Sequence, residues 1–221
     1  QLAAQRRKPM FSWGWDFNPR IPAVGIWRPV GLVREKEAVI SGHHIKTDRI
    51  DVDGTAHLKL LVEVERTSST GNLSVDIDLT DPDGETHHVE IEIPAGNDRA
   101  AGQADLSLAN AALWWTHDLG TPMLHDLSLR LTDEGSLLDE AEDRIGIRTI
   151  ELDRSEDPEG GRLFRFVLNG VPVFARGAAW IPADMMLGSV SAERYQSLLE
   201  LAVEGEMNML RVWGGGIYEH D

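Results

Sequence analysis

Residues 207–218 read Met-Asn-Met-Leu-Arg-Val-Trp-Gly-Gly-Gly-Ile-Tyr, and this stretch decides how the fold is interpreted. A short apolar run that contains an arginine leads into a tryptophan and three glycines. The pattern is typical of a buried parallel strand that delivers polar and aromatic groups to the mouth of an α/β barrel. Because the sequence holds a single helix–strand unit of this kind, we expect the chain to be a piece of a larger enzyme.

A helix is predicted directly before this strand. Ser191 is a suitable N-cap, and Gly205 can end the helix. The apolar positions between them fall on one helical face and are Tyr195, Leu198, Leu199 and Ala202. The strand predicted to follow spans 207–213.

A change of pattern separates this helix–strand unit from the rest of the chain. Residues 153–162 are polar and rich in glycine, which marks a loop or linker. After the linker, Asn169-Gly170 separates the apolar runs 163–168 and 171–175, a strong signal for a hairpin. Hairpin, long loop, helix and strand in this order predict that residues 153–221 form the first units of a (β/α)8 barrel.

Residues 46–152 alternate between apolar and polar side chains. A period of two with one apolar face predicts half-buried antiparallel strands. The clearest runs are 58–64, 73–79, 89–93 and 127–131. Asp81-Pro82-Asp83-Gly84 joins two of them with ordinary hairpin-turn chemistry. About seven short strands over roughly 100 residues predict an immunoglobulin-like β-sandwich for 46–152.

Residues 1–45 show little regular periodicity. Trp13, Trp15 and Trp27 lie here among glycines and prolines. This irregular pattern favours the end of an all-β domain whose earlier strands lie upstream. The predicted fold class is therefore mainly β: an immunoglobulin-like sandwich, preceded by the last part of another β domain and followed by the start of a barrel.

The composition excludes several classes of function. The chain has 37 acidic and 21 basic side chains and a formal charge of −16, which argues against nucleic acid and against anionic membrane surfaces as partners. There is no cysteine, so disulfides, thiolate zinc sites and cysteine nucleophiles are excluded. No apolar run reaches about 18 residues, and we expect no transmembrane helix. No cofactor is expected, because the glycine run lacks dinucleotide-binding or P-loop spacing.

The sequence allows two interpretations each for Arg211 and Trp213. An arginine inside an apolar strand needs a carboxylate partner, since a buried lone charge is very costly, so Arg211 is either in a structural ion pair or in an active-site wall. Trp213 is either a core side chain before a loop or an aromatic face on which a sugar can stack.

Asp16 lies among four aromatic rings, those of Phe11, Trp13, Trp15 and Phe17. Rings supply apolar contact and a carboxylate accepts hydrogen bonds, so the cluster suits a neutral ligand rich in hydroxyl groups. The alternative is the core of a domain interface.

No metal site is expected. His43-His44 and His87-His88 are adjacent pairs, and neighbouring residues on a strand point to opposite faces, so neither pair can readily chelate one ion. Asp51–Gly54 and Asp81–Gly84 are similar to calcium loops, but both lack the distal glutamate and are interpreted as turns.

Four segments, in the same order along the chain, resemble the family 2 β-mannosidases. They match the end of that family's sugar-binding-like jelly-roll domain, the end of its immunoglobulin-like domain, the opening of its catalytic barrel and its second barrel strand. The matching segments are 8–29 with Phe-Ser-Trp-Gly-Trp-Asp, 113–115 with 145–148, 168–184, and 207–219. The resemblance assigns 1–45 to the C-terminal part of the jelly-roll domain.

The resemblance implies a retaining exo-glycosidase that removes terminal β-linked mannose. Such chemistry needs two carboxyl groups about 5 Å apart, and in the family both are glutamates on later barrel strands, beyond Asp221. The chain by itself is therefore expected to be inactive. By position, Asp16 would bind sugar hydroxyls, Trp213 would form an aromatic wall and Arg211 would lie beside the nucleophile. The implied partner is a mannoside or manno-oligosaccharide.

Two departures from the family's pattern concern the aromatic side chain after Asp16 and a polar contact near the barrel entrance. Members commonly have Trp-Asp-Trp-Gly-Pro where this chain has Phe17 after Asp16, and Gly-Ala-Asn-Trp where it has Ala179 before Trp180. Two alternatives remain open at this point. One is another family 2 specificity, such as a β-galactosidase, β-glucuronidase or exo-glucosaminidase, and the other is a non-catalytic carbohydrate-binding or interaction module.

Overall fold

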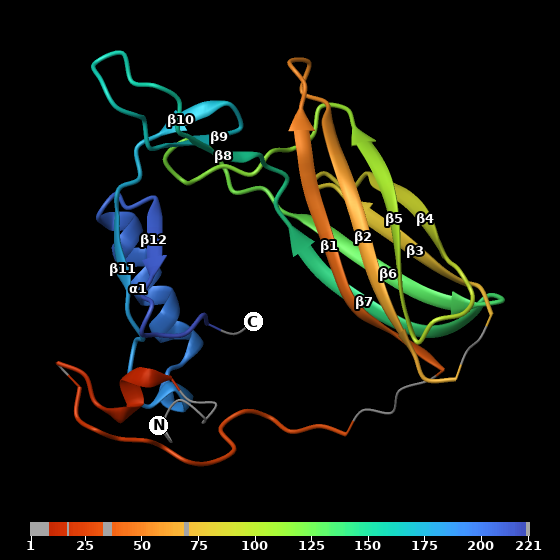
Figure 1. The fold of residues 1–221 in the computed structure, drawn as a ribbon, viewed down its shortest axis with the longest axis horizontal. Helices are drawn as coiled ribbons and strands as arrows, with labels where there is room; N and C mark the ends of the chain where they lie inside the picture. Colours follow the sequence, from red (N-terminus) through yellow and green to blue (C-terminus); the bar gives the residue numbers. More distant parts are fainter. Residues whose placement is uncertain (1–8, 17, 33–36, 69–70, 220–221) are drawn as a thin grey trace. The chain divides into compact units, whose positions relative to one another are not determined.

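The computed structural model describes residues 9–16, 18–32, 37–68 and 71–219 (Figure 1). The chain divides into two compact units, one formed by 33–174 and one by 1–32 together with 175–221. It is mainly β with several antiparallel sheets, as the sequence predicts. Lys8 and Phe17, which the sequence analysis placed in the first matching segment, lie outside the described residues. The described helices are too short to cross a bilayer.

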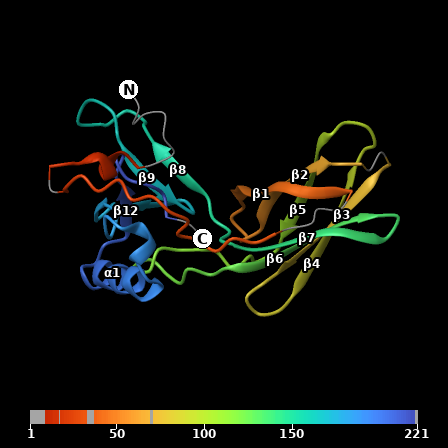
Figure 2. The same cartoon turned by 90° about the horizontal axis from the view of Figure 1, so that it is seen from below.

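The larger unit contains an immunoglobulin-like sandwich of two antiparallel sheets (Figures 1 and 2). One sheet has the order β1-β2-β5 and the other β4-β3-β6-β7. In a constant-type immunoglobulin domain the fourth strand joins the first sheet, whereas here β4 stays beside β3. The strands are β1 Ala38–Ile50, β2 Ala56–Arg66, β3 Leu73–Thr80, β4 Thr86–Ile93, β5 Arg99–Leu108, β6 His125–Asp133 and β7 Ser136–Ile145.

The core lies between the two sheets. Alternate side chains of β2, β3 and β6 point inward and are buried, which confirms the strands predicted from the period of two. The Asp81–Gly84 turn joins β3 to β4, with the Asp81 amide donating to the Glu85 carbonyl at 2.8 Å. Each fully buried Leu, Ile or Val contributes roughly 1.5–3 kcal/mol. The core includes Leu58, Leu60, Val62, Val64, Val75, Ile77, Leu79, Leu127, Leu129 and Leu131.

β5 and β1 of the sandwich lack a clear sequence signal. The first part of β5 turns small residues inward (Ala100, Gly102 and Ala104), and a Cβ on Gly102 would overlap the side chains of Ile91 and Ile93 on β4. β1 has irregular register after Ile40 and after Thr47, which interrupts the alternation. The predicted boundary at residue 45 falls inside this strand.

A third antiparallel sheet of order β10-β9-β8 completes the larger unit. It comprises β8 Ile150–Asp153, β9 Arg165–Leu168 and β10 Val171–Val173. The Asn169-Gly170 turn between β9 and β10 is confirmed, with φ of 48° and 79°. The Asn169 side chain accepts from the Thr149 amide at 2.9 Å and donates to the Trp114 carbonyl at 3.0 Å. This asparagine therefore ties the small sheet to the loop that connects β5 to β6.

The Trp114 segment packs against residues 145–148. A Cβ on Gly146 would lie 2.8 Å from the Trp114 ring, so the close approach requires glycine. The Arg148 guanidinium lies 4.6 Å from the centre of the same ring. Two segments that the family resemblance singled out thus serve to join the sandwich to the next sheet.

Candidate functional site

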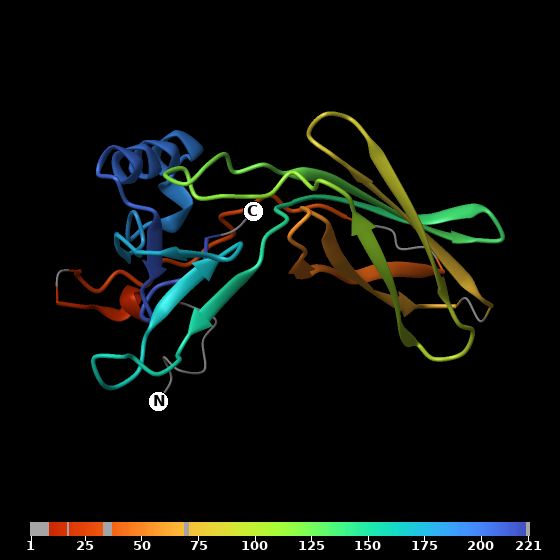
Figure 3. The same ribbon diagram turned by 90° about the horizontal axis from the view of Figure 1, so that it is seen from above.

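The smaller unit contains a parallel pair of strands joined by a helix (Figure 3). β11 spans Gly177–Trp180, α1 spans Ala192–Glu204 and β12 spans Met209–Val212. The predicted helix is confirmed: Ser191 is its N-cap and accepts a hydrogen bond from the Arg194 amide at 3.3 Å. Gly205 follows the helix with a negative φ of −77°, and Glu206 takes the left-handed conformation with φ 56°.

Specific backbone contacts bring β11 and β12 together. A Cβ on Gly177 would overlap the Met209 carbonyl oxygen, so this position requires glycine. The Arg176 amide donates to the Asn208 side-chain oxygen at 2.9 Å, and the Asn208 amide donates to the Arg176 carbonyl at 2.9 Å. Asn208 therefore fixes where the second strand begins beside the first.

Trp213 and the glycine run directly follow β12. The Trp213 amide donates to the Trp180 carbonyl at 2.9 Å, which extends the strand pairing by one residue. A Cβ on Gly215 would lie 2.5 Å from the Trp213 ring, whereas Gly214 has open space around it. The ring therefore folds over the backbone of Gly215, and Trp213 stays partly accessible.

The Trp15 ring contacts the Trp213 ring, although nearly the whole chain separates the two residues. Their centroids are 5.0 Å apart in an edge-to-face arrangement with an interplanar angle of 70°. A short 3-10 helix, Met10–Trp13, leads into this segment and buries Phe11 and Ser12.

Asp16 immediately follows Trp15 at the tip of a tight turn. Trp15 and Asn18 exchange reciprocal backbone hydrogen bonds of 3.0 and 3.2 Å, which close the turn. Asp16 is exposed, so its carboxylate is available to accept hydrogen bonds. The Trp15–Trp213 contact thus brings the start of this turn to the end of β12.

Arg211 does not have the environment predicted for it. The expectation of a buried strand is wrong, because β12 has partly exposed side chains and Arg211 is exposed. The physical reason is that, in the part of the chain the structure describes, β12 has a single neighbour, β11, where Arg211 lies opposite Ala179. No ion pair of Arg211 is found among the described residues.

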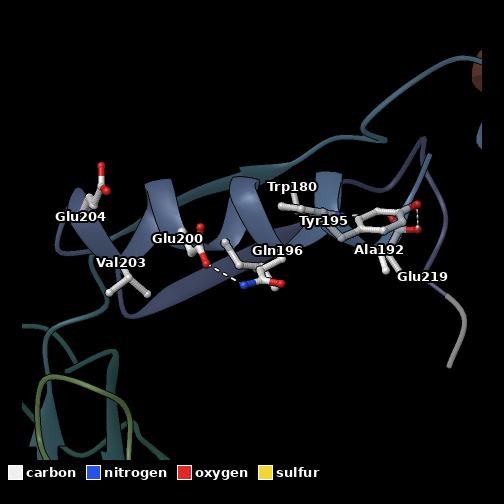
Figure 4. A pocket seen from close by; sticks show the side chains of 9 residues that line it. Trp180, Ala192, Tyr195, Gln196, Glu200, Val203, Glu204 and Glu219 are labelled. Carbon is white, nitrogen blue, oxygen red and sulfur yellow. Dashed lines mark hydrogen bonds between the residues drawn. The ribbon is translucent and has the colours of Figure 1, made fainter.

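Glu219 makes a contact that the sequence analysis did not predict. Trp180 Nε1 donates to one of its carboxylate oxygens at 3.0 Å, and the Tyr195 hydroxyl donates to the other at 2.7 Å (Figure 4). Burial, together with the hydrogen bond to Glu219, raises the pKa of Tyr195 to about 12. Because two donors hold this carboxylate, Glu219 acts as a structural link between β11, α1 and the segment after β12.

An open groove of about 820 Å³ runs along the same side of α1 (Figure 4). It begins at Trp180 and Glu219, passes Tyr195 and continues to the end of the helix at Val203 and Glu204. The groove is shallow, and the Gln196 amide spans part of it to reach Glu200 at 2.8 Å.

Comparisons of the sequence and of the structure with known proteins point to the same family. Residues 38–148 match the family described as glycosyl hydrolases family 2. The β-mannosidase B of Aspergillus flavus is 36% identical over 217 residues, which are 97% of this chain and 25% of that protein. The crystal structure of β-D-mannosidase from Dictyoglomus thermophilum matches with a TM-score of 0.86 at 35% identity, over 97% of this chain and 26% of that one.

A more distant match shares the fold alone. Bacteroides uniformis β-glucuronidase matches with a TM-score of 0.63 at 21% identity, over 84% of this chain and 22% of that one. The chain spans about a quarter of the length of the curated relatives it matches. The resemblance to family 2 β-mannosidases that the sequence analysis identified is confirmed.

Proposed function

This chain belongs to glycosyl hydrolases family 2, and we propose that it is the part of a retaining exo-β-mannosidase that carries one side of the sugar-binding subsite. The observation that carries the proposal is the 5.0 Å contact between the rings of Trp15 and Trp213. It joins the aromatic segment near the start of the chain to the end of a parallel strand. In an α/β barrel, that end of the strand is where substrates bind.

The domain assignment is part of this proposal. Residues 1–45 would be the end of a jelly-roll domain, 46–152 the immunoglobulin-like sandwich, and 153–221 the start of a (β/α)8 barrel. The parallel pair β11–β12 with α1 between them supports the last assignment, because a helical crossover between parallel strands is the repeating unit of such a barrel.

Three side chains have roles in the proposed subsite. Trp213 would form an aromatic wall against the apolar face of the mannose ring. Asp16 would accept hydrogen bonds from sugar hydroxyls, for which its exposure at the tip of a turn is suitable. Arg211 would lie beside the nucleophile and favour its charged form.

The proposal assigns the reacting carboxyl groups to barrel strands outside this chain. Retaining glycosidases need an acid/base and a nucleophile about 5 Å apart. Glu219 is a poor candidate for either role, because Trp180 and Tyr195 already donate to both of its oxygens. We therefore expect the 221-residue chain to bind sugar weakly and to hydrolyse nothing.

Exposed apolar side chains in the smaller unit also support the proposal that this chain is part of a larger protein. On α1, Leu201 and Val203 are 58% and 50% exposed, and the segment after Trp15 carries Val24 at 91% and Ile26 at 85%. Apolar faces of this kind mark surfaces that pack against further structure. The rest of a barrel and of a jelly-roll domain would cover them.

An assay with aryl glycosides tests the proposal on two proteins: the 221-residue chain and the full-length product of its gene. The full-length protein should hydrolyse the aryl β-mannoside, and the chain should not. Asp16→Asn in the full-length protein should lower kcat/KM by about 10- to 100-fold, the value of a hydrogen bond to a charged group. Asp105→Asn, a change at an exposed position on β5, is the matched control and should have no effect.

Each outcome of the assay has a defined meaning. Preference of the full-length protein for β-galactosides or β-glucuronides would replace mannose as the proposed substrate. Turnover by the 221-residue chain alone would contradict the assignment of the reacting carboxyl groups to other strands.

A further inference from the structure

Four polar side chains occupy the core-facing side of the four-stranded sheet at one of its ends. They are Asp81 and Glu85, which flank the turn between β3 and β4, His87 near the start of β4, and His125 at the start of β6. None of these four residues belongs to the subsite proposed above. Most other inward positions of β3, β4 and β6 are held by Leu, Ile and Val.

The strand register explains why these residues face the same way. Leu79 lies opposite both His87 on β4 and Leu127 on β6, and it is buried in the core. Side chains two residues apart on a strand share a face. Asp81 therefore continues the inward face of β3, and His125 continues that of β6. Glu85 lies two residues before His87 and therefore on the same face, at the exposed end of the sheet.

The atoms with which three of these residues could bind a metal ion lie close together. His87 Nε2 lies 3.2 Å from one carboxylate oxygen of Asp81. Ligand atoms of Asp81, Glu85 and His87 all lie within 4.8 Å of one another. Two ligands of a tetrahedral zinc ion, each about 2.0–2.2 Å from the metal, lie roughly 3.3 Å apart, so small side-chain movements bring this set to zinc geometry.

His125 provides independent support, because it is a buried side chain that lacks a well-aligned hydrogen bond. It is 0% exposed, and neither of its ring nitrogens has a hydrogen-bond partner among the described residues. Its Nε2 lies 3.2 Å from the second oxygen of Asp81, Oδ1, which is itself buried and lacks a well-aligned hydrogen bond. A buried polar group left unsatisfied destabilises the folded state, so a side chain kept in this state needs an explanation.

We propose that Asp81, Glu85 and His87 bind a divalent transition-metal ion of the zinc type, and that His125 is a positioning residue behind Asp81. One imidazole and two carboxylates are a ligand set that zinc accepts, with water completing the tetrahedron. A metal ligand is commonly oriented by a second side chain that does not touch the ion. When Asp81 turns one oxygen to the ion, the other can accept a properly aligned hydrogen bond from His125.

The expected consequence is a clamp on the β3–β4 hairpin. The ion would cross-link the turn to the start of β4, and through Asp81 and His125 also to β6. Binding to the folded state alone stabilises a protein in proportion to the logarithm of ligand concentration, so zinc should raise the melting temperature of the sandwich.

Titration calorimetry with Zn²⁺ on the tag-free, EDTA-treated chain tests the proposal. We expect one ion per chain, and His87→Ala should weaken binding by at least tenfold. His88→Ala is the matched control, because this neighbour faces the opposite side of the sheet and pairs with Asp78 at 2.8 Å. No heat at millimolar Zn²⁺, or equal loss in both variants, would overturn the site.

The role of His125 needs a readout that folding alone does not change. Co²⁺ bound to the chain should give the visible absorption bands of a tetrahedral site. His125→Leu, which removes the donor and keeps a bulky side chain, should shift those bands and weaken Co²⁺ binding by about tenfold, the usual effect of losing a residue that orients a ligand. His125→Gln, whose side-chain nitrogen reaches about as far as histidine Nε2 and can donate to Asp81, should restore part of the affinity. Unchanged spectra and affinity in a folded His125→Leu variant would contradict the positioning role.

Discussion

The sandwich and the helix–strand unit differ sharply in how much apolar surface they bury. In the sandwich, Leu60, Ile77 and Leu129 are at most 1% exposed. Within residues 9–32 and 175–219, the single buried apolar side chain among those described is Phe11. No described residue of α1 is buried, although its cap and its apolar face both match the sequence pattern.

This difference shows that local signals and stability are separate properties. A cap, a helical period and two parallel strands specify the shape of the smaller unit, but a helix of this length is marginal without packing. The sandwich has two sheets that cover each other, so it has its own core. We infer that the sandwich is self-sufficient and that the helix–strand unit depends on further structure to cover its apolar face.

The largest expected effect is the difference in stability loss between a Leu→Ala substitution in the sandwich and one in the helix–strand unit. Leu129→Ala in the core of the sandwich should lower the free energy of unfolding by about 2–5 kcal/mol, because it leaves a cavity. Leu199→Ala on α1 changes a side chain that is 48% exposed and should change stability by about 0.5 kcal/mol or less. Urea unfolding followed by circular dichroism measures both. Equal losses would remove the distinction between the regions.

A smaller effect is expected from the glycines of the parallel pair. Gly177→Ala forces a Cβ against the Met209 carbonyl and should cost the β11–β12 pairing about 1–3 kcal/mol. Gly214→Ala is the control, because a Cβ there meets nothing within 4 Å. The indole N–H signals of Trp180 and Trp213 in NMR spectra should shift in the first variant and stay in place in the second. Identical spectra would mean that the pairing is not formed in solution.

The smallest effect is a pH dependence confined to the helix–strand unit. The pKa of Tyr195 is raised from 10.0 to about 12, mainly by burial, so folding favours the neutral phenol. The associated stabilisation is fully present below pH 10 and is lost as pH rises from 10 to about 12. Tyrosinate absorbance in a Tyr218→Phe background reports Tyr195 alone, since the chain has two tyrosines. Adding Glu219→Gln should lower the midpoint, and an unmoved midpoint would contradict the contribution of the hydrogen bond.

Much of the sandwich could be predicted from the sequence, because β2, β3, β4 and β6 each have one buried face of large apolar side chains. β5 could not, since its inward positions are small where Ile91 and Ile93 fill the space above Gly102. β1 could not, because its register shifts break the period of two.

The candidate site was less accessible to sequence reasoning. The helix, its cap and the strand before Trp213 follow from local patterns. The contact between Trp15 and Trp213 has no local signal and was not predicted, although the family resemblance implied that Asp16 and Trp213 belong to one subsite. The burial of Arg211 was wrongly predicted, since an apolar strand is buried only where neighbours cover it. The Asp81, Glu85 and His87 cluster depends on strand register, although the period of two places Glu85 and His87 on one face.

Hydrogen exchange measured residue by residue across the 221-residue chain tests the central claim most directly. The account predicts that amides of β2, β3 and β6 exchange only through global opening of the sandwich, about a hundredfold or more slowly than those of α1, β11 and β12. Equal protection of the two regions would show that the helix–strand unit is stable by itself, and would contradict its dependence on further structure.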